Sequence, residues 1–255
     1  MAFRTAGAQH IGLGHVRRCL SLALALRVKG GSSVFLLDGD PDLCGVIEAE
    51  GFETRHIHIR DDVESTLGHC REFIIDAIVA DSYALSTSYF QAMKGVVPVV
   101  AVLDDLADRE LPVTLVVNGS AGADELHYRG GPNTKYLLGP RYIMLRPEFS
   151  EAPVTHTRDA IQRILITVGG SDPYGLTSRL IQWTDASLPD VKQDVVVGPL
   201  FSDTDALKEI ARNVAGTITI HENPGEIRTL MLNADIALCG GGQTTYELAA
   251  TGTPT

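Results

Sequence analysis

Short apolar runs alternate along this chain with stretches of helical spacing, and this alternation limits the fold more than any other feature. In the first half, the runs lie at 2–5, 34–37, 54–59, 77–81, 97–103, 115–118 and 136–138. Helical stretches are expected from near residue 15 to 29 and over 42–50, 62–74 and 86–94. Because the runs are apolar throughout, they are typical of strands covered on both faces. The pattern predicts an α/β fold with a parallel, doubly wound sheet.

The alternation restarts in the second half, which indicates a second domain. Strands are expected at 164–168, 194–197, 217–221 and 236–239, with a helix from Pro173 to about Ala186 and another after residue 242. The segment between the halves contains Pro147 and Pro153 and has no clear period. We therefore predict two Rossmann-like domains, 1–140 and 159–255, joined by a linker over 141–158. Since only four strands precede residue 255, we expect the second domain to be truncated at its C-terminus.

Composition excludes some classes of function. The net charge of -11 disfavours a nucleic-acid binder, because such proteins present a basic face. No apolar run reaches the roughly 18 residues that a membrane helix needs, so no membrane span is expected. The four cysteines lie far apart and form no C-x-x-C pair. They are typical of reduced thiols in a cytoplasmic protein.

The first strand leads through a glycine-containing loop into a helix, and His15 stands where that helix begins. Gly12 and Gly14 allow a ligand to approach the backbone, and a helix N-terminus favours negative charge. A helix N-terminus disfavours the imidazolium, so His15 is a candidate general base. The alternative is a histidine that only caps the helix. Arg17 stands where the dinucleotide fingerprint has its third glycine, which argues against an NAD site.

A second strand, glycine loop and helix follow at 236–251. Gly240, Gly241 and Gly242 permit close approach of a diphosphate, and Thr244 and Thr245 offer hydroxyl and N–H donors. Glu247 is an acceptor suited to the two hydroxyls of a ribose. The alternative is a structural turn in which Glu247 only complements the helix N-terminus.

Polar residues follow several strands of the first domain. In a doubly wound sheet the carboxyl ends of the strands form one edge, where ligands bind. We expect Asp81, Tyr83, Asp104, Asp105 and Asn118 to lie along this edge with His15. For Asp104 and Asp105 a role in capping the next turn has equal weight. In the linker, Arg146 and Glu148 could face the cleft, and the alternative, which we favour, is an ordinary surface ion pair.

An ordered series of short motifs points to a known family. The series consists of Arg4, IGLGHVRRCL at 11–20, DSY at 81–83, DDLADR at 104–109, LGPRY at 138–142, LRPEF at 145–149, VGGSDP at 168–173 and GGQTTYE at 241–247. It resembles the UDP-sugar hydrolase of pseudaminic acid biosynthesis, a relative of the two-domain glycosyltransferases of the GT-B fold. The likeness runs along the whole chain.

The resemblance implies that water attacks the anomeric carbon of a UDP-linked 2,4-diacetamido-2,4,6-trideoxy-hexose. UDP and the free sugar would be released with inversion, without a metal or another cofactor. His15 matches the family's base that activates water, and Tyr83 matches a tyrosine near the sugar. The loop 240–245 matches the diphosphate-binding loop, and Glu247 matches the ribose carboxylate. The expected substrate-binding residues are Gly12, Gly14, Arg17, Asp81, Gly170, Ser171, Gly241, Gly242, Gln243, Thr244, Thr245 and Glu247.

Two other functions remain open from the sequence. A glycosyltransferase would use the same UDP-sugar donor and pass the sugar to an acceptor, because water and an acceptor compete at the same carbon. A non-catalytic nucleotide-sugar binder would not need His15 or Tyr83.

Overall fold

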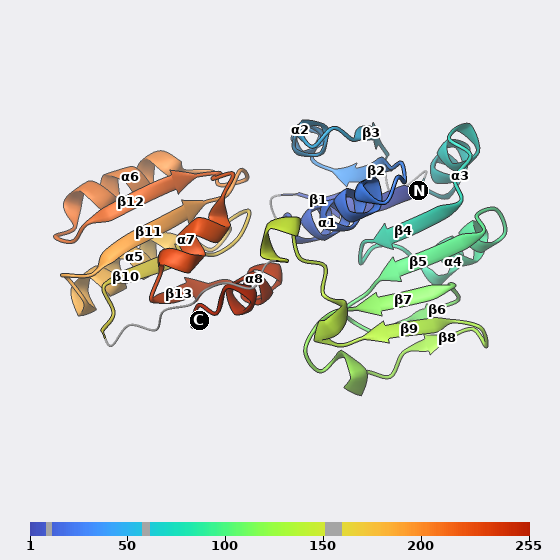
Figure 1. Cartoon of the computed structure of the whole chain (residues 1–255). Helices are drawn as coiled ribbons and strands as arrows, with labels where there is room; N and C mark the ends of the chain where they lie inside the picture. Colours follow the sequence, from blue (N-terminus) through green and yellow to red (C-terminus); the bar gives the residue numbers. More distant parts are fainter. Residues whose placement is uncertain (9–11, 58–61, 151–159) are drawn as a thin grey trace. The chain divides into compact units, whose positions relative to one another are not determined.

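The computed structural model describes residues 1–8, 12–57, 62–150 and 160–255. The chain forms two compact units, which are shown in Figure 1. The N-terminal unit contains Met1–Ala8 and His15–Met144, and the C-terminal unit contains residues 12–14 and Leu145–Thr255 among those that are described. Each unit has its own parallel sheet.

The sheet of the N-terminal unit has the strand order β3-β2-β1-β4-β5-β7-β9, and all its neighbours are parallel. Its strands are β1 (Ala2–Gly7), β2 (Val34–Gly39), β3 (Glu53–His56), β4 (Ala77–Asp81), β5 (Val99–Leu103), β7 (Leu115–Asn118) and β9 (Lys135–Leu138). The helices are α1 (Gly14–Val28), α2 (Asp42–Ala49), α3 (Asp62–Glu72) and α4 (Thr87–Lys94). Two short strands, β6 (Glu110–Leu111) and β8 (Arg129–Gly130), form a separate parallel pair.

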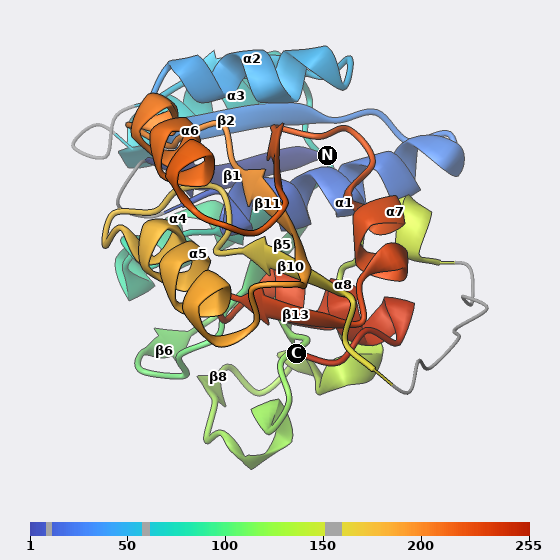
Figure 2. The ribbon, with the colours of Figure 1, turned by 90° about the vertical axis from the view of Figure 1, so that its left-hand side faces the viewer.

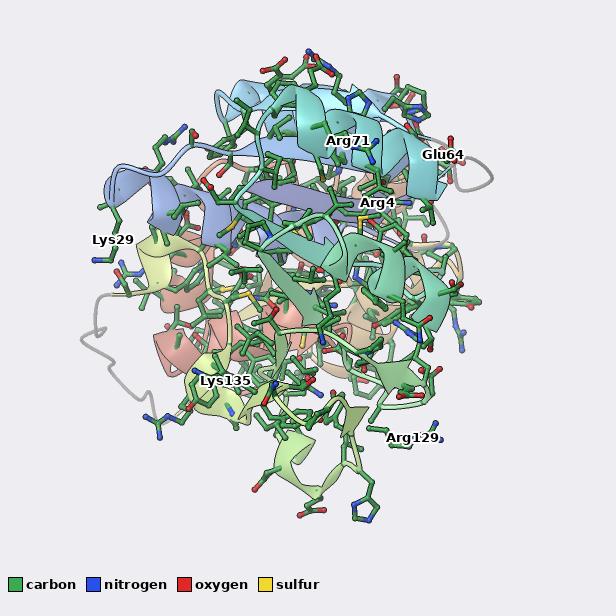
Figure 3. All side chains as sticks on the ribbon, turned by 90° about the vertical axis from the view of Figure 1, so that its right-hand side faces the viewer. Arg4, Lys29, Glu64, Arg71, Arg129 and Lys135 are labelled. Carbon is green, nitrogen blue, oxygen red and sulfur yellow. The ribbon has the colours of Figure 1, made fainter. Side chains whose placement is uncertain are left out.

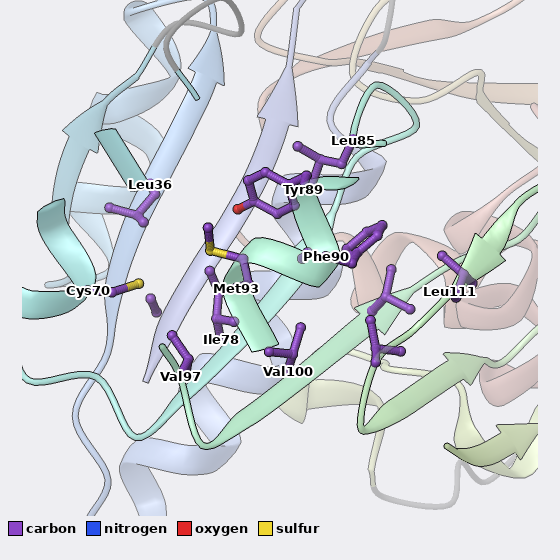
Figure 4. Close-up of a cluster of buried hydrophobic side chains, with 14 of the residues drawn as sticks. Leu36, Cys70, Ile78, Leu85, Tyr89, Phe90, Met93, Val97, Val100 and Leu111 are labelled. Atoms are coloured by element: carbon purple, nitrogen blue, oxygen red, sulfur yellow. The ribbon is translucent and has the colours of Figure 1, made fainter. Parts of the chain in front are cut away.

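Apolar side chains from alternate strand positions and from the helices form the core of this unit. Tyr89, Phe90 and Met93 of α4 pack against Ile78 of β4 and Val100 of β5, as Figure 4 shows. On the opposite face of the sheet, the Phe3 and Phe35 rings stack with centroids 5.0 Å apart. Burial on both faces explains why the strands are apolar throughout.

Strand β1 also carries a charged side chain into this interior. Arg4 of β1 is fully buried and pairs with Asp38 at 3.4 Å. Figure 3 shows Arg4 within the unit, whereas Lys29 and Arg129 lie at its periphery. Burying a charge is costly unless it is paired, so Asp38 is needed to hold Arg4 in the sheet.

The sheet of the C-terminal unit has the order β12-β11-β10-β13, again parallel. Its strands are β10 (Arg163–Thr167), β11 (Lys192–Val197), β12 (Ile218–Glu222) and β13 (Ile236–Cys239). Figure 2 shows α5 (Leu176–Ser187) and α6 (Thr204–Asn213) on one face, and α7 (Ile227–Asn233) and α8 (Gln243–Thr251) on the other. Ile181 and Leu207 fill one core layer, and Met231 and Leu248 the second. The prediction of doubly wound parallel sheets is confirmed.

Several element bounds differ from those predicted. The segments 204–213 and 227–233 are helices that the sequence analysis did not identify. Helix α5 begins at Leu176 rather than in the turn after Pro173, because the Asp172 carboxylate accepts the N–H groups of Leu176 and Thr177. Strand β3 ends at His56, and residues 58 and 59 of the predicted strand lie outside the described residues.

The predicted linker contains short helical turns. Pro140–Tyr142 and Pro147–Phe149 are single 3₁₀ turns, each begun by a proline. The two units divide between Met144 and Leu145, and residues 151–158 of the linker lie outside the described residues. Phe149 packs into the core of the C-terminal unit with Met231 and Leu248, which fixes this part of the segment to that unit.

Candidate functional site

In the N-terminal unit, His15 and Asp81 meet at the carboxyl end of two neighbouring strands. Strand β1 pairs with both β2 and β4, so the chain leaves β1 at the point where the strand order reverses. Ligands of doubly wound sheets bind at such a point. Helix α1, which follows β1, carries His15 in its first turn, and β4 ends at Asp81.

A hydrogen bond joins the two side chains. His15 Nδ1 lies 2.6 Å from Asp81 Oδ1, and both residues are buried. Within the described part of the chain, no hydrogen bond is found for His15 Nε2. A carboxylate that receives Nδ1–H leaves Nε2 as the basic nitrogen of a neutral ring.

Arg18 completes the group, and it was not predicted as a site residue. Its Nε donates to Asp81 Oδ2 at 2.5 Å, and its Nη2 donates to Asp81 Oδ1 at 2.6 Å. Burial alone would raise the pKa of Asp81, but the hydrogen bonds and charge of Arg18, followed by those of His15, lower it. Burial would likewise lower the pKa of Arg18, but Asp81 and then Asp105 raise it. Both side chains are therefore ionised at neutral pH.

Tyr83 lies beside this group at the surface. Its ring is 4.7 Å from the His15 ring in an edge-on arrangement, and its hydroxyl donates to Asp105 Oδ2 at 3.1 Å. The same Asp105 oxygen accepts from Arg18 Nη1 at 2.7 Å. Burial, and then the charge of Asp105, raises the pKa of Tyr83 to about 12. Tyr83 is consequently a neutral hydroxyl at the edge of the site.

The structure gives Asp104 and Asp105 different roles, which the sequence did not distinguish. Asp104 Oδ1 accepts the N–H groups of Leu106 and Ala107, so Asp104 caps the turn. Asp105 instead reaches Arg18 and Tyr83. Asn118 is also used locally, since its side chain accepts from Ser120 N and donates to the Tyr128 hydroxyl.

In the C-terminal unit, glycine turns follow the neighbouring strands β10 and β13. A Cβ atom at Gly240 would lie 2.6 Å from Val168 O, so this glycine is required by close backbone packing. Gly241 and Gly242 are different, because a Cβ at either would have open space around it and both residues are exposed. Gly242 has a φ of 129°, which favours glycine. The open part of the turn is thus Gly241–Gly242.

The two helices that follow these turns begin differently. Asp172 caps α5 with its own carboxylate, which places a negative charge at that N-terminus. The residue before α8 is Gly242, which has no side chain of its own to cap the helix, and the first turn of α8 contains no acidic residue. Gln243, Thr244 and Thr245 form this first turn and are partly exposed. The positive end of the helix dipole lies at the start of α8, and such a position favours negative charge.

Glu247 lies one turn further along α8 and is paired. It is only 2% exposed, and its Oε1 accepts from Arg146 Nε at 2.8 Å. Arg146 also pairs with Glu148 at 3.1 Å, as the sequence suggested, but it is not confined to that surface pair. Arg146 was missed because its partner is far along the chain.

The remaining predicted residues belong to helix α1, to the residues just before it, and to the turn after β10. Gly12 has a φ of 80°, Gly14 is the first residue of α1, and Arg17 is partly buried on that helix. Gly170 and Ser171 follow β10, and Gly170 O accepts from Leu200 N at 3.0 Å. In the described ranges, no group of three or more His, Cys, Asp or Glu side chains is placed to hold a metal ion. Nor does any described helix have the length and hydropathy needed to cross a bilayer.

Three curated proteins are similar in sequence. An uncharacterized protein of Methanocaldococcus jannaschii is 26% identical over 100% of this chain and 54% of its own length. The spore coat polysaccharide biosynthesis protein SpsG of Bacillus subtilis is 28% identical over 54% of this chain and 42% of its own length. The third is a Helicobacter pylori protein named pseudaminic acid cytidylyltransferase and UDP-2,4-diacetamido-2,4,6-trideoxy-beta-L-altropyranose hydrolase. It is 23% identical over 95% of this chain and 41% of its own length. The chain spans about half the length of these relatives. No family model matches it.

Solved glycosyltransferase structures match almost the whole chain. MurG of Acinetobacter baumannii aligns with a TM-score of 0.61 at 16% identity, covering 98% of this chain and 76% of MurG. The spinosyn rhamnosyltransferase SpnG, in complex with spinosyn aglycone, gives 0.66 at 13% identity, covering 99% and 79%. SpnG in complex with thymidine diphosphate gives 0.64 at 15% identity, covering 100% and 79%. At these identities the likeness shows the fold, and the expected GT-B fold is confirmed.

Proposed function

We propose that this chain belongs to an enzyme that hydrolyses a UDP-linked 2,4-diacetamido-2,4,6-trideoxy-hexose to UDP and the free sugar, with inversion. The observation that carries the proposal is the 2.6 Å contact between His15 Nδ1 and Asp81 Oδ1 at the strand-order reversal of the N-terminal sheet. A histidine oriented in this way by a buried carboxylate is the arrangement that a general base needs.

In the proposed reaction, His15 Nε2 takes a proton from water as the water oxygen attacks the anomeric carbon. The bond between that carbon and the diphosphate oxygen breaks, and its electron pair leaves with UDP. Because the leaving group is already a stable anion, it needs little protonation. A general base contributes about a hundred- to ten-thousand-fold to such a step. Tyr83, held beside the His15 ring, is proposed to contact the sugar.

The C-terminal unit is proposed to bind the diphosphate through the turn before α8. Gly241 and Gly242 are exposed and uncrowded, and the first turn of α8 contains no acidic residue. Backbone N–H groups and the helix dipole stabilise negative charge at such a position. They would also stabilise the charge that develops on the leaving diphosphate. Thr244 and Thr245 are proposed to add hydroxyl donors.

Glu247 remains the proposed ribose-binding residue, and it would have to bind the ribose while it is also paired with Arg146. One carboxylate oxygen already accepts from Arg146, and the side chain is buried. A carboxylate has about four lone-pair positions, so the contact with Arg146 does not use its full capacity. We expect Glu247→Ala to weaken UDP binding more than it lowers the turnover of bound substrate.

The similar proteins support two reactions of a nucleotide-sugar substrate, hydrolysis and transfer. The name of the Helicobacter pylori relative includes the hydrolase activity, and SpsG is named for polysaccharide biosynthesis. The solved structures of this fold are glycosyltransferases, which favours transfer to an acceptor as the second candidate function. Both reactions use the same donor and break the same bond.

The test is incubation of the protein with candidate UDP-sugars in the absence of any acceptor. Hydrolysis predicts release of UDP and free sugar in equal amounts. Release of UDP only after an acceptor is added would support transfer instead. Binding of the UDP-sugar with no release under either condition would overturn both catalytic proposals and leave a nucleotide-sugar binder.

A further inference from the structure

Arg18 is the side chain that connects all the polar groups around His15. It lies three residues after His15 on α1, so both face the same side of the helix. Its three nitrogens reach different acceptors: Nε and Nη2 bind the two oxygens of Asp81, and Nη1 binds Asp105 Oδ2. The side chain is only 15% exposed, so it contributes little to the surface.

The first consequence concerns the orientation of Asp81. A guanidinium that binds both carboxylate oxygens holds the plane of the carboxylate. Asp81 Oδ1 is thereby kept 2.6 Å from His15 Nδ1. Arg18 Nη2 is also near Nδ1, at 3.2 Å, but a deprotonated Nδ1 would then place its lone pair against Oδ1 at 2.6 Å. Of the two neutral tautomers, the shorter contact therefore favours the one with the proton on Nδ1, in which the lone pair is on Nε2.

The second consequence concerns charge. A carboxylate next to a histidine favours the imidazolium, which cannot accept a proton. The charged groups around the ring are Asp81, Asp105 and Arg18, and the neighbouring neutral groups are Tyr83 and Cys19. Burial, and then the charge of Asp81, raises the pKa of Cys19, which keeps the thiol neutral. Arg18 is the cation that offsets Asp81 beside the ring.

The third consequence concerns Tyr83. Its hydroxyl donates to the same Asp105 oxygen that Arg18 Nη1 binds. The Tyr83 ring edge contacts the His15 ring. Arg18 therefore fixes His15 through Asp81 and Tyr83 through Asp105.

We propose that Arg18 is a positioning residue for the hydrolysis, one that makes Nε2 the basic nitrogen of His15 and holds Tyr83 beside the ring. This inference rests on the proposed function for the reaction that it serves. Arg18 touches neither water nor sugar in this role. It acts through the two aspartates.

The test uses nitrogen-15 NMR of the histidine side chains at neutral pH, with the His15 signals assigned by their loss in His15→Gln. The unmodified protein is expected to show a protonated Nδ1 and an unprotonated Nε2. In Arg18→Gln, Asp81 is no longer offset by a cation, so His15 is expected to carry protons on both nitrogens. Arg27→Gln removes a cation from the same helix, where Arg27 binds Glu50 O, and is expected to leave the His15 signals unchanged.

Turnover provides the second measurement. Arg18→Gln is expected to lower kcat by at least about tenfold, with a smaller change in KM, because it removes the basic lone pair rather than a substrate contact. Added guanidinium is expected to restore part of kcat in Arg18→Ala and none in Arg27→Ala. A purely structural role of Arg18 predicts no such selective rescue.

Asp105→Asn changes the partner of Tyr83 but leaves both groups of the Arg18–Asp81 pair in place. It therefore separates the effect on Tyr83 from the effect on the buried carboxylate Asp81. It is expected to preserve the His15 tautomer while lowering kcat through a less ordered Tyr83. An unchanged His15 spectrum in a folded Arg18→Gln, or the unprotonated nitrogen at Nδ1 in the unmodified protein, would overturn the inference. Failure of the unmodified protein to release UDP would instead overturn the proposed function, because the NMR result does not depend on turnover.

Discussion

At the scale of single residues, the proposed chemistry depends on His15 and its buried partner Asp81. The two are 66 positions apart, and no local pattern connects them. The sequence placed both at the same edge of the sheet because each follows an apolar strand. Their contact, however, requires β1 and β4 to be neighbours, and the hydrophobic pattern does not predict the order of strands in a sheet.

Arg18 shows a different limit of sequence reasoning. The sequence prediction of substrate-binding residues contained Arg17 and not Arg18. A helix places i and i+3 on the same side, so Arg18 is the arginine that shares a face with His15. The spacing of His15 and Arg18 is visible in the sequence, so this pairing of faces could be predicted. The distant pair of Arg146 and Glu247, by contrast, depends on how the chain folds after residue 145.

Replacing His15 tests the proposed base. We expect His15→Ala to lower kcat by at least about a hundredfold, because the attacking water loses its proton acceptor. Affinity for UDP should change little, since the proposed diphosphate loop lies elsewhere in the chain. Steady-state kinetics and calorimetric titration with UDP measure the two effects. Near-normal turnover would show that another group is the base.

Asp81 gives a prediction about stability and pH. Its pKa in the folded protein is lowered, despite burial, by Arg18 and then by His15. A carboxyl whose folded-state pKa is depressed stabilises the fold above the unfolded-state pKa, and this contribution is lost as pH falls through the folded-state pKa. The free energy of unfolding should therefore decrease on the acid side of about pH 4.

Urea unfolding at a series of pH values measures this slope. In Asp81→Asn the acid-side decrease should be smaller, because that titration is absent. The variant should also be less stable at neutral pH, since it leaves the buried Arg18 without its main partner. An identical dependence on pH in both proteins would contradict the assignment of Asp81 as an ionised buried group.

At the scale of elements, the apolar strands were the predictable part. Strands such as β4, β7 and β13 are short Val, Ile and Leu runs, and their predicted bounds agree with the structure. Helices α6 and α7 were missed for physical reasons. Helix α6 has one buried residue, Leu207, among many charged positions, and α7 spans only Ile227–Asn233. Their stability comes from packing on the sheet, which sequence periodicity does not report.

The glycine turn before α8 gives a matched pair of variants. At Gly240 an added Cβ would lie 2.6 Å from the Val168 carbonyl oxygen, whereas at Gly241 it would meet nothing within 4 Å. Gly240→Ala should destabilise the protein by about 1–3 kcal/mol, the usual effect of overpacking a close contact. Gly241→Ala should change the free energy of unfolding by no more than about 0.5 kcal/mol.

Thermal and urea unfolding of the two variants provide the comparison. A loss of stability confined to Gly240→Ala would agree with a turn whose first glycine is structural and whose second is open. Equal destabilisation by both substitutions would show that Gly241 is also packed, and would remove the argument for an open anion-binding turn.

At the scale of the whole molecule, the two Rossmann-like units were predictable and the individual contacts were not. The alternation of strands and helices, interrupted at the proline-containing segment, is enough to define two parallel sheets. Each sheet places a candidate group where its strand order reverses: His15 and Asp81 between β1 and β4, and the glycine turns between β10 and β13. Fold alone does not specify hydrolysis, because the same architecture occurs in the glycosyltransferases described above.

The most direct test of the central claim is the reaction of a UDP-sugar in water enriched in oxygen-18, without an acceptor, for the unmodified protein and for His15→Ala. Attack of water on the anomeric carbon predicts label in the free sugar, none in UDP, an inverted anomer as the first product, and a loss of about a hundredfold or more in His15→Ala. Label in UDP, or equal rates for the two proteins, would contradict the account.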